Sequence, residues 1–577
     1  MSTLPREAER RRRILTRAVP LALVALIAFL WGASAGGSNS PEKEIVERFA
    51  AAWERRDFKA MYSQLDPASR RSVAETEFAA AYREAAELAT LREMELDAPG
   101  DPTEREGSTV VPLGAQLGTV AFGTLEAELE VPASSEGIAW DASLVFPGLR
   151  SGERLESEVE LADRAPILAI DGTPLAEGPA AAREHPLGSA AIDVSGEVGM
   201  AEAEDLPRLA RQGFPPGTPV GISGLERAFN QRLAGKPGGA LLAVDDASGA
   251  SRTLAEARPR PGAPVKTTVD PDLQEAAVAA LGGRLGGIAV LDTDSGDVRA
   301  VAGQAFSAPR PPGSTFKLVT TTAALQEGAV SLDDEFEITD GINVGGRFIY
   351  NANGEFCGGS FPEAFAHSCN AVFAPLGPAV GNDKLVEAAE RFGFNSPPSL
   401  YGPEVVRAME LPEASIPTEI GTELDLGVSA IGQGEVLATP LQMATVAQAI
   451  ANNGIREPTS VVANRKLRAD AEPVRVMTEE LSEQITDLMV GVVAGGTGTA
   501  GAIAEAQVAG KTGTAELGPK PGQEDAPNPV QIKDAWFAAF APAERPRLAV
   551  AVLLIEAEAS GGEVAAPAAA EVLSAGL

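Results

Sequence analysis

The 577-residue sequence predicts an α+β protein with several folded parts. Its hydrophobic fraction of 44% and its charged fraction of 22% are those of an ordinary globular chain. At roughly 150 residues per domain, the length is enough for about four domains. Amphipathic helical patterns come first and alternating strand patterns follow, and both kinds return in the long carboxyl-terminal part. Helices and strands that are segregated in this way are typical of the α+β class.

The first 40 residues read as a basic tail, a membrane anchor and a linker. Arginines at 10–13 and 17 directly precede an uncharged, mostly apolar run at residues 18–33. As a helix this run would extend about 24 Å, slightly less than the bilayer core of about 30 Å. The basic cluster predicts a cytoplasmic amino terminus, so we expect a single-pass protein of the cell membrane whose remaining chain is extracytoplasmic. Cleavage as a signal peptide at Ala33-Ser34-Ala35 is the alternative.

Three further domains are expected beyond the anchor. Residues 41–150 combine helices of three- and four-residue apolar spacing with strand-like runs, the last of them at 138–146, which predicts a small α+β module. Residues 151–262 are rich in Gly, Pro, Ala and Glu and close with an Arg-Pro-Arg-Pro-Gly linker. Residues 263–577 begin with a strand, a helix and a β-hairpin, which predicts a large α+β domain.

Charge and composition exclude several classes of function. The formal net charge is −34, and it becomes −38 without the first 35 residues, which carry six Arg and two Glu. Phosphate contacts need Lys and Arg, so we expect no nucleic-acid partner. Two His and two Cys leave few ligands for zinc and little scope for histidine catalysis. We therefore expect no metal and no cofactor, and a Ser or Thr nucleophile assisted by Lys or a carboxylate.

One serine and one lysine stand out at the start of an apolar helix. Ser314 and Lys317 are three residues apart, so they share one helix face. A neutral amine there can take the hydroxyl proton if burial or nearby positive charge lowers its pKa. Ser40 and Lys43 have the same spacing, but we interpret them as a plain helix start with Ser40 as its cap.

Two more motifs follow in order. Ser368-Cys369-Asn370 opens a helical stretch, and Lys511-Thr512-Gly513-Thr514 is expected on a strand, where Gly513 lets another backbone approach closely. With Ser314 and Lys317, this set resembles the penicillin-binding protein and serine β-lactamase superfamily in type, order and spacing. The flanking residues 431–434 and 535–537 are similar to the transpeptidase version. Cys369 stands where the general pattern has Asp, a departure that transpeptidases of the family tolerate.

The resemblance implies an architecture. Residues 263–577 would form a transpeptidase domain with a central antiparallel sheet flanked by helices. Residues 41–150 are similar to the nuclear-transport-factor-2-like amino-terminal domain of methicillin-resistance type penicillin-binding proteins. Residues 151–262 resemble the dimerisation or pedestal domain of the same family, and whether two chains pair there is left open.

The resemblance also implies roles for four residues in bond making and breaking. Ser314 would attack the carbonyl between the two terminal D-Ala residues of a peptidoglycan stem peptide, with Lys317 as general base. Ser368 would relay a proton to the departing D-Ala, and Asn370 would orient Lys317. Lys511 and Thr512 would then lie near the substrate carboxylate, and Thr514 would give a backbone N–H to the oxyanion hole.

The function implied is that of a monofunctional class B peptidoglycan D,D-transpeptidase, which β-lactams acylate and which needs a separate glycan polymerase as partner. A D,D-carboxypeptidase or β-lactamase, in which water resolves the acyl-enzyme, is the enzymatic alternative. A non-catalytic scaffold or β-lactam sensor is the alternative of another class. The motifs do not distinguish cell elongation and shape from division or sporulation, nor do they fix antibiotic resistance.

The two cysteines, Cys357 and Cys369, lie in the part expected outside the cytoplasm, where disulfides form. Closing a loop of about a dozen residues would stabilise the fold by roughly 3 kcal/mol. Two free buried thiols are the alternative. His367 adjoins Ser368, but neighbouring residues at a helix start point apart, so we expect a structural role for it rather than a serine–histidine pair.

Overall fold

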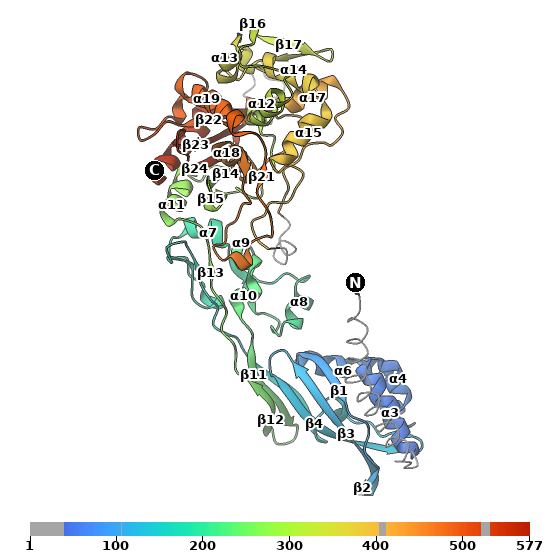
Figure 1. Cartoon of the computed structure of the whole chain (residues 1–577). Coiled ribbons are helices and arrows are strands. Elements are labelled where there is room, and N and C mark those ends of the chain that lie inside the picture. Colours follow the sequence, from blue (N-terminus) through green and yellow to red (C-terminus); the bar gives the residue numbers. More distant parts are fainter. Residues whose placement is uncertain (1–39, 106, 403–410, 521–530) are drawn as a thin grey trace, which may run out of the picture. The chain divides into compact units, whose positions relative to one another are not determined.

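The computed structural model describes residues 40–105, 107–402, 411–520 and 531–577, and it is an α+β protein as predicted (Figure 1). The described chain divides into two compact units. The first unit contains residues 40–160, 207–214 and 237–259, and the second contains 161–206, 215–236 and 260–577. The expected anchor at residues 18–33 lies outside the described residues. No helix within the described ranges is long and apolar enough to cross a bilayer.

The amino-terminal part of the first unit packs helices against an antiparallel sheet of order β1-β3-β4-β5. Ser40 caps the first helix by accepting a hydrogen bond from the Lys43 N–H at 3.3 Å, which confirms that this Ser–Lys pair is a helix start. The rings of Phe49, Trp53 and Tyr82 meet in the core between the helices and the sheet. The elements are α3 (Pro41–Glu54), α4 (Phe58–Ser63), α5 (Ser69–Ser72), α6 (Glu75–Leu88), β1 (Leu91–Leu96), β2 (Thr103–Arg105), β3 (Ser108–Thr119), β4 (Thr124–Ser134) and β5 (Gly137–Ile138).

The strand expected at residues 138–146 is wrong beyond its first residue. Only Gly137 and Ile138 pair with β4, and Ala142–Val145 form a 3-10 turn, η2. The Asp141 carboxylate accepts the Ser143 N–H at 2.7 Å and so starts this turn. A short polar side chain that hydrogen-bonds the local backbone competes with strand pairing, and here the turn forms instead of the strand.

The middle of the chain contributes to both units. Strands β6 (Glu153–Glu160), β11 (Gly238–Asp245) and β12 (Ser251–Ala257) form a three-stranded sheet within the first unit. Most of the remaining middle residues belong to the second unit, where buried Glu226 accepts hydrogen bonds from Arg164 and Arg183, each with a guanidinium nitrogen at 2.7 Å. The domain bounds 151–262 therefore stay a prediction, because residues of this range belong to both compact units.

The middle elements within the second unit are short. They comprise β7 (Ile167–Leu168), β8 (Pro174–Ala176), α7 (Ser189–Ser195), β9 (Val198–Met200), β10 (Pro219–Gly221), α9 (Gly224–Ala228), α10 (Asn230–Ala234) and β13 (Val265–Lys266). Strand β13 pairs in parallel with β7, so the sheet order is β13-β7-β8.

A five-stranded antiparallel sheet of order β15-β14-β24-β23-β22 forms the centre of the carboxyl-terminal domain. Alternate residues of its central strands enter two different cores, so both faces are covered. Helices α11 (Pro271–Leu281) and α20 (Ala566–Gly576) pack on one face and α18 (Pro440–Ala451) on the other. The strands are β14 (Gly286–Asp292), β15 (Val298–Gly303), β22 (Ala509–Pro519), β23 (Gln531–Ala541) and β24 (Leu548–Ala557).

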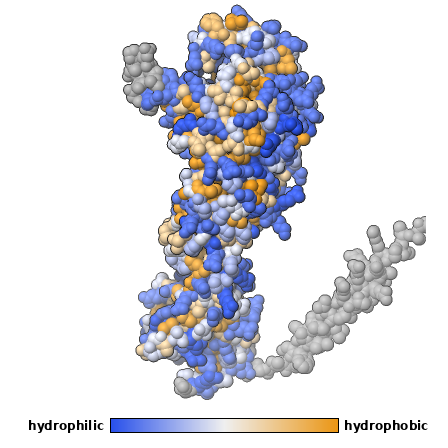
Figure 2. All heavy atoms as spheres, turned by 90° about the vertical axis from the view of Figure 1, so that its left-hand side faces the viewer, coloured by the Kyte–Doolittle hydropathy of each residue, from blue (hydrophilic) through white to orange (hydrophobic). Residues whose placement is uncertain are grey.

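Helices and small sheets complete this domain beside β22. Helix α12 (Lys317–Gln326) is buried from its first residue through Ala324, which makes it the central helix. The other elements are β16 (Glu335–Thr339), β17 (Gly341–Val344), β18 (Arg347–Tyr350), β19 (Cys357–Ser360), α13 (Phe361–Ala366), α14 (Asn370–Val380), α15 (Asn382–Arg391), α17 (Glu423–Ala430) and α19 (Glu479–Gly495). On the face shown in Figure 2, hydrophilic residues are interspersed with groups of apolar residues.

Candidate active site

The three predicted motifs meet where α12, the α13–α14 turn and β22 come together. Ser314 lies in a 3-10 turn, η4 (Gly313–Phe316), that leads directly into α12 at Lys317. Ser368 lies between α13 and α14, and Lys511 lies on β22. Hydrogen bonds join Ser368 to both lysines, and the close packing of Gly313 on the Thr514 backbone brings the Ser314 turn beside the same strand.

Lys317 is completely buried among uncharged partners. Its Nζ donates to the Ser368 carbonyl at 2.7 Å and to Asn370 Oδ1 at 2.8 Å, and it lies 3.2 Å from Ser368 Oγ. The Phe373 ring lies beneath it, 5.1 Å away at its centroid. Burial, with a further contribution from the charge of Lys511, holds the pKa of Lys317 well below its ordinary value. Lys317 can therefore serve as a neutral base.

Lys511 approaches Ser368 from β22. Its Nζ donates to Ser368 Oγ at 2.9 Å and to the Thr512 carbonyl at 3.2 Å, and the Phe365 ring centroid is 5.6 Å away. Complete burial lowers the pKa of Lys511 to about 7. Two amines thus converge on one hydroxyl oxygen, an arrangement through which a proton can pass from one group to another.

Ser368 has an uncommon backbone conformation. Its φ is +58°, in the left-handed region that a non-glycine residue rarely adopts. The turn around it is fixed by two backbone hydrogen bonds, from the Ser368 N–H to Phe365 at 3.1 Å and from the Cys369 N–H to Ala364 at 2.9 Å. This conformation turns both the carbonyl and the hydroxyl of Ser368 toward Lys317, so the strain is associated with the site geometry.

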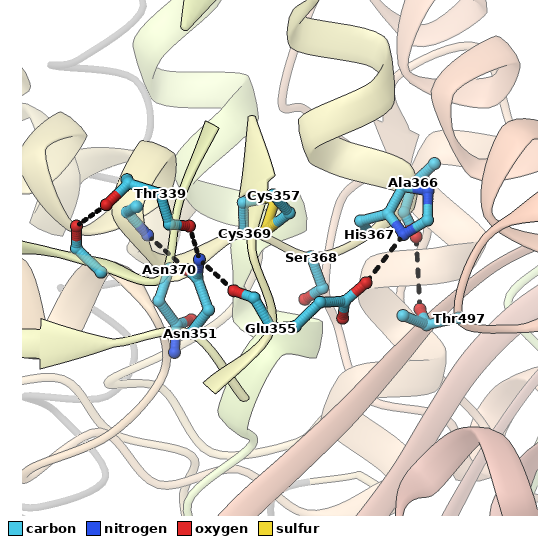
Figure 3. Close-up of a disulfide and its surroundings, with 12 residues drawn as sticks. Thr339, Asn351, Glu355, Cys357, Ala366, His367, Ser368, Cys369, Asn370 and Thr497 are labelled. Carbon is cyan, nitrogen blue, oxygen red and sulfur yellow. Dashed lines mark hydrogen bonds and ion pairs between the residues drawn. A yellow bond between two sulfur atoms is a disulfide. The ribbon is translucent and has the colours of Figure 1, made fainter. Parts of the chain in front are cut away.

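Two asparagines hold the middle motif in place (Figure 3). Asn370 donates from Nδ2 to the Tyr350 carbonyl at 2.9 Å, which orients its Oδ1 toward Lys317. Asn351 is buried and accepts the Ala371 N–H at 2.9 Å while donating to the carbonyls of Thr339 and Glu355. Sequence reasoning missed Asn351, because its partners lie in segments that no local pattern connects.

A disulfide joins Cys357 at the start of β19 to Cys369 at the start of α14 (Figure 3). The cross-link therefore lies within the middle motif, between Ser368 and Asn370. The neighbouring His367 has its Nδ1 3.3 Å from a Glu355 carboxylate oxygen, and both side chains are about half exposed. His367 thus pairs with an acidic side chain on the surface.

Gly513 permits a close approach between β22 and the Ser314 turn. A Cβ atom at Gly513 would lie 2.7 Å from the Pro312 carbonyl oxygen and 2.9 Å from Trp536 Cβ. A larger residue would push the turn away from the strand. Gly513 therefore permits a close contact between two segments of the protein itself, strand β22 and the turn that carries Ser314.

Thr497, in the segment after α19, is a second residue that sequence reasoning missed. Its N–H donates to the Ala366 carbonyl at 3.1 Å (Figure 3). Its Oγ1 lies 2.6 Å from Thr512 Oγ1. Thr497 therefore connects the end of α13 with the Lys-Thr-Gly strand. If the Thr497 hydroxyl donates to Thr512, the Thr512 proton is left to point into the site.

The acidic side chain of Asp534 on β23 is buried and pairs with Arg310, four residues before Ser314. Arg310 Nε is 3.3 Å from Asp534 Oδ2, and Asp534 Oδ1 accepts the Glu556 N–H at 3.1 Å. This ion pair attaches the segment that precedes Pro311 and Pro312 to strand β23 of the central sheet.

Within the described ranges, no group of three or more His, Cys, Asp and Glu residues could hold a metal ion.

The disulfide is expected to stabilise the domain. Replacing both Cys357 and Cys369 by Ser should lower the free energy of unfolding by about 3 kcal/mol, because the unfolded chain regains the entropy of a loop of about a dozen residues. Urea unfolding of the oxidised protein, the reduced protein and the double variant measures this. Reductant should not affect the double variant, and equal stability of oxidised and reduced protein would contradict the prediction.

The charge of Lys511 is expected to act on Lys317. In a Lys511→Met variant the pKa of Lys317 should rise, because one of the two causes that lower it is removed while burial remains. Nuclear magnetic resonance of 13C-labelled lysine can follow this titration, since the chain has only ten lysines. Lys520→Met, at a surface lysine paired with Glu558, is the matched control. An unchanged or lower pKa of Lys317 would contradict the coupling.

Three family models match the sequence. They are the penicillin-binding protein transpeptidase domain at residues 286–574, the penicillin-binding protein dimerisation domain at 171–267, and the NTF2-like N-terminal transpeptidase domain at 41–153. The first model alone covers half of the chain.

Relatives with names and solved structures agree with these models. Peptidoglycan D,D-transpeptidase PbpA of Mycolicibacterium smegmatis is 37% identical over 294 residues, 48% of this chain and 56% of that protein. PbpA of Mycobacterium tuberculosis is 36% identical over 292 residues, with the same shares. The chain thus matches little more than half the length of these relatives.

Two solved structures share the fold. The ceftriaxone acyl-enzyme complex of penicillin-binding protein A from M. tuberculosis superposes with a TM-score of 0.57 at 27% identity, covering 72% of this chain and 98% of that one. The D,D-transpeptidase domain of a peptidoglycan glycosyltransferase from Eggerthella lenta gives 0.57 at 28% identity, with the same coverage. With its three motifs assembled around Ser368, the chain belongs to the penicillin-binding protein transpeptidase family.

Proposed function

We propose that this protein is a peptidoglycan D,D-transpeptidase that acts through an acyl-enzyme on Ser314 and is acylated there by β-lactams. The observation that carries the proposal is the buried pair of lysines, Lys317 at the start of the helix that follows Ser314 and Lys511 on β22, whose amines both contact Ser368 Oγ. The named relatives are peptidoglycan D,D-transpeptidases, and a solved neighbour is a β-lactam acyl-enzyme.

Acylation begins with the attack of Ser314 Oγ on the carbonyl between the two terminal D-Ala residues. Lys317 takes the hydroxyl proton, because burial and the charge of Lys511 lower its pKa and so favour the neutral amine. The new bond is an ester between Ser314 and the penultimate D-Ala. Ser368 gives its proton to the nitrogen of the departing D-Ala, and Lys317 or Lys511 restores that proton through the contacts at 3.2 and 2.9 Å.

Substrate binding is assigned to the third motif. Strand β22 is the last in the sheet order, so its outer edge can accept an extended stem peptide as a further strand. Lys511 supplies positive charge and Thr512 a hydroxyl for the substrate carboxylate, while the Thr514 N–H stabilises the oxyanion. Gly513 keeps this strand close to the Ser314 turn.

The acyl-enzyme is resolved by an amine of a neighbouring stem peptide, which forms the cross-link and frees Ser314. Attack by water instead would make the protein a D,D-carboxypeptidase or a β-lactamase. We further infer a single-pass location in the cell membrane from residues 18–33, with the catalytic domain outside the cytoplasm and a separate glycan polymerase as partner. The match to a dimerisation domain supports a homodimer.

Ser314→Ala is expected to abolish covalent labelling by a fluorescent penicillin, because it removes the only atom proposed to bond the drug. The measurement is in-gel fluorescence of the full chain after incubation with the penicillin. Ser40→Ala is the matched control, since Ser40 also precedes a lysine by three residues but caps α3, and it should label like the parent. Persistent labelling of Ser314→Ala would show that another residue is the nucleophile.

Thr497→Val is expected to slow acylation by a penicillin about tenfold, because Thr512 loses the partner that orients its hydroxyl toward the carboxylate. Acylation by the methyl ester of the same penicillin, which lacks the charge, should change less. Thr497→Ser keeps the hydroxyl and should restore the rate. Equal slowing with acid and ester would mean that Thr497 has only a structural role.

A further inference from the structure

The β17–β18 hairpin has two chemically different faces. Cross-strand partners in an antiparallel pair share a face, and successive residues alternate between the faces. Val344 is buried, and Ile342 and Ile349 pack against the core of the second unit. The opposite, outer face therefore contains the pairs Gly341 with Tyr350 and Asn343 with Phe348.

The two aromatic residues of the outer face are exposed to solvent. Phe348 is 42% exposed and Tyr350 is 62% exposed. Their rings contact edge to face, with centroids 4.7 Å apart. A Cβ atom at Gly341 would lie 2.6 Å from Phe348 Cε1, so the ring rests on the bare glycine backbone. An exposed aromatic pair of this kind marks a contact surface, because its burial by a ligand is favourable.

The strand that carries the two rings is hydrogen-bonded to the active site. The Tyr350 carbonyl accepts a hydrogen bond from Asn370 Nδ2 at 2.9 Å, and Asn370 Oδ1 accepts one from Lys317 at 2.8 Å. Only two hydrogen bonds therefore separate the backbone of Tyr350 from the amine of Lys317. The two rings therefore lie on a strand that is attached to the active site.

We propose that Phe348 and Tyr350 bind a sugar ring of the glycan strand that carries the stem peptide. This inference rests on the proposed function. The outer face has no charged side chain but offers two ring faces, a phenol and the Asn343 amide. That chemistry fits a neutral N-acetylated sugar, which has apolar C–H faces and hydroxyl and amide groups, and does not fit the carboxylates of the stem.

The reach of the substrate is compatible with this position. An extended peptide spans roughly 3.3–3.6 Å per residue, so a stem of three or four residues places its sugar about 10–14 Å from the scissile bond. The Tyr350 backbone is linked to Lys317 through Asn370, so a group at this distance can meet the strand that carries the two rings.

The test measures sugar binding and acylation separately on the full chain. The probe is a soluble β-1,4-linked N-acetylglucosamine oligomer without peptide, titrated by calorimetry. The variant is Phe348→Ser with Tyr350→Ser, which leaves the Tyr350 carbonyl in place. Leu285→Ser, at an apolar residue that is 54% exposed in the turn before β14, is the matched control. Labelling by fluorescent penicillin is measured on all three proteins.

We expect the parent and the control to bind the oligomer and the double variant to bind it at least about tenfold more weakly, with penicillin labelling unchanged in all three. Equal binding by the double variant, or no binding by the parent at millimolar oligomer, would overturn the proposal. So would a change in oligomeric state confined to the double variant, because the face would then be a contact with a second copy. Failure of the parent to label would instead refute the proposed function.

Discussion

The burial of two amines around one hydroxyl is the constraint on which the rest of the domain depends. Lowering the pKa of Lys511 from 10.5 to about 7 corresponds to about 5 kcal/mol against its charged form. That cost must be met by packing elsewhere, here by two cores on the two faces of the central sheet and by a helix, α12, that is buried almost throughout. A looser domain would admit water and restore the ordinary pKa of both lysines.

The middle motif is where this constraint acts on the backbone. Ser368 must present two oxygens to Lys317, which requires a φ of +58°. Such a conformation persists only where its surroundings fix it from several sides. The Cys357–Cys369 disulfide and the Asn351 hydrogen bonds fix it on one side, and Thr497 holds the end of α13 on the other.

Local patterns in the sequence predict the elements that carry the chemistry, since the start of an apolar helix and a distinctive tripeptide are visible without tertiary structure. The Ser314, Ser368 and Lys511 motifs were predicted on this basis, and the structure brings them together. Thr497, Asn351 and the Arg310–Asp534 pair were not predicted, because their roles exist only through partners in distant segments. The strand expected at residues 138–146 does not form beyond Ile138, for a local reason. The Asp141 carboxylate accepts a hydrogen bond from the nearby backbone and so competes with strand pairing, and the apolar pattern of the segment does not reveal this competition.

The same pair of lysines explains how one site can hold a base and a positive charge at once. Two like charges beside one hydroxyl disfavour the doubly protonated state, so the loss of a proton from one amine favours the charged form of the other. In the proposed reaction, a substrate carboxylate beside Lys511 would stabilise the charged form of that residue. Lys317, held by Asn370 and the Ser368 carbonyl, would then be the neutral amine. On the proposed mechanism, substrate binding would therefore select the protonation state in which Ser314 can be activated.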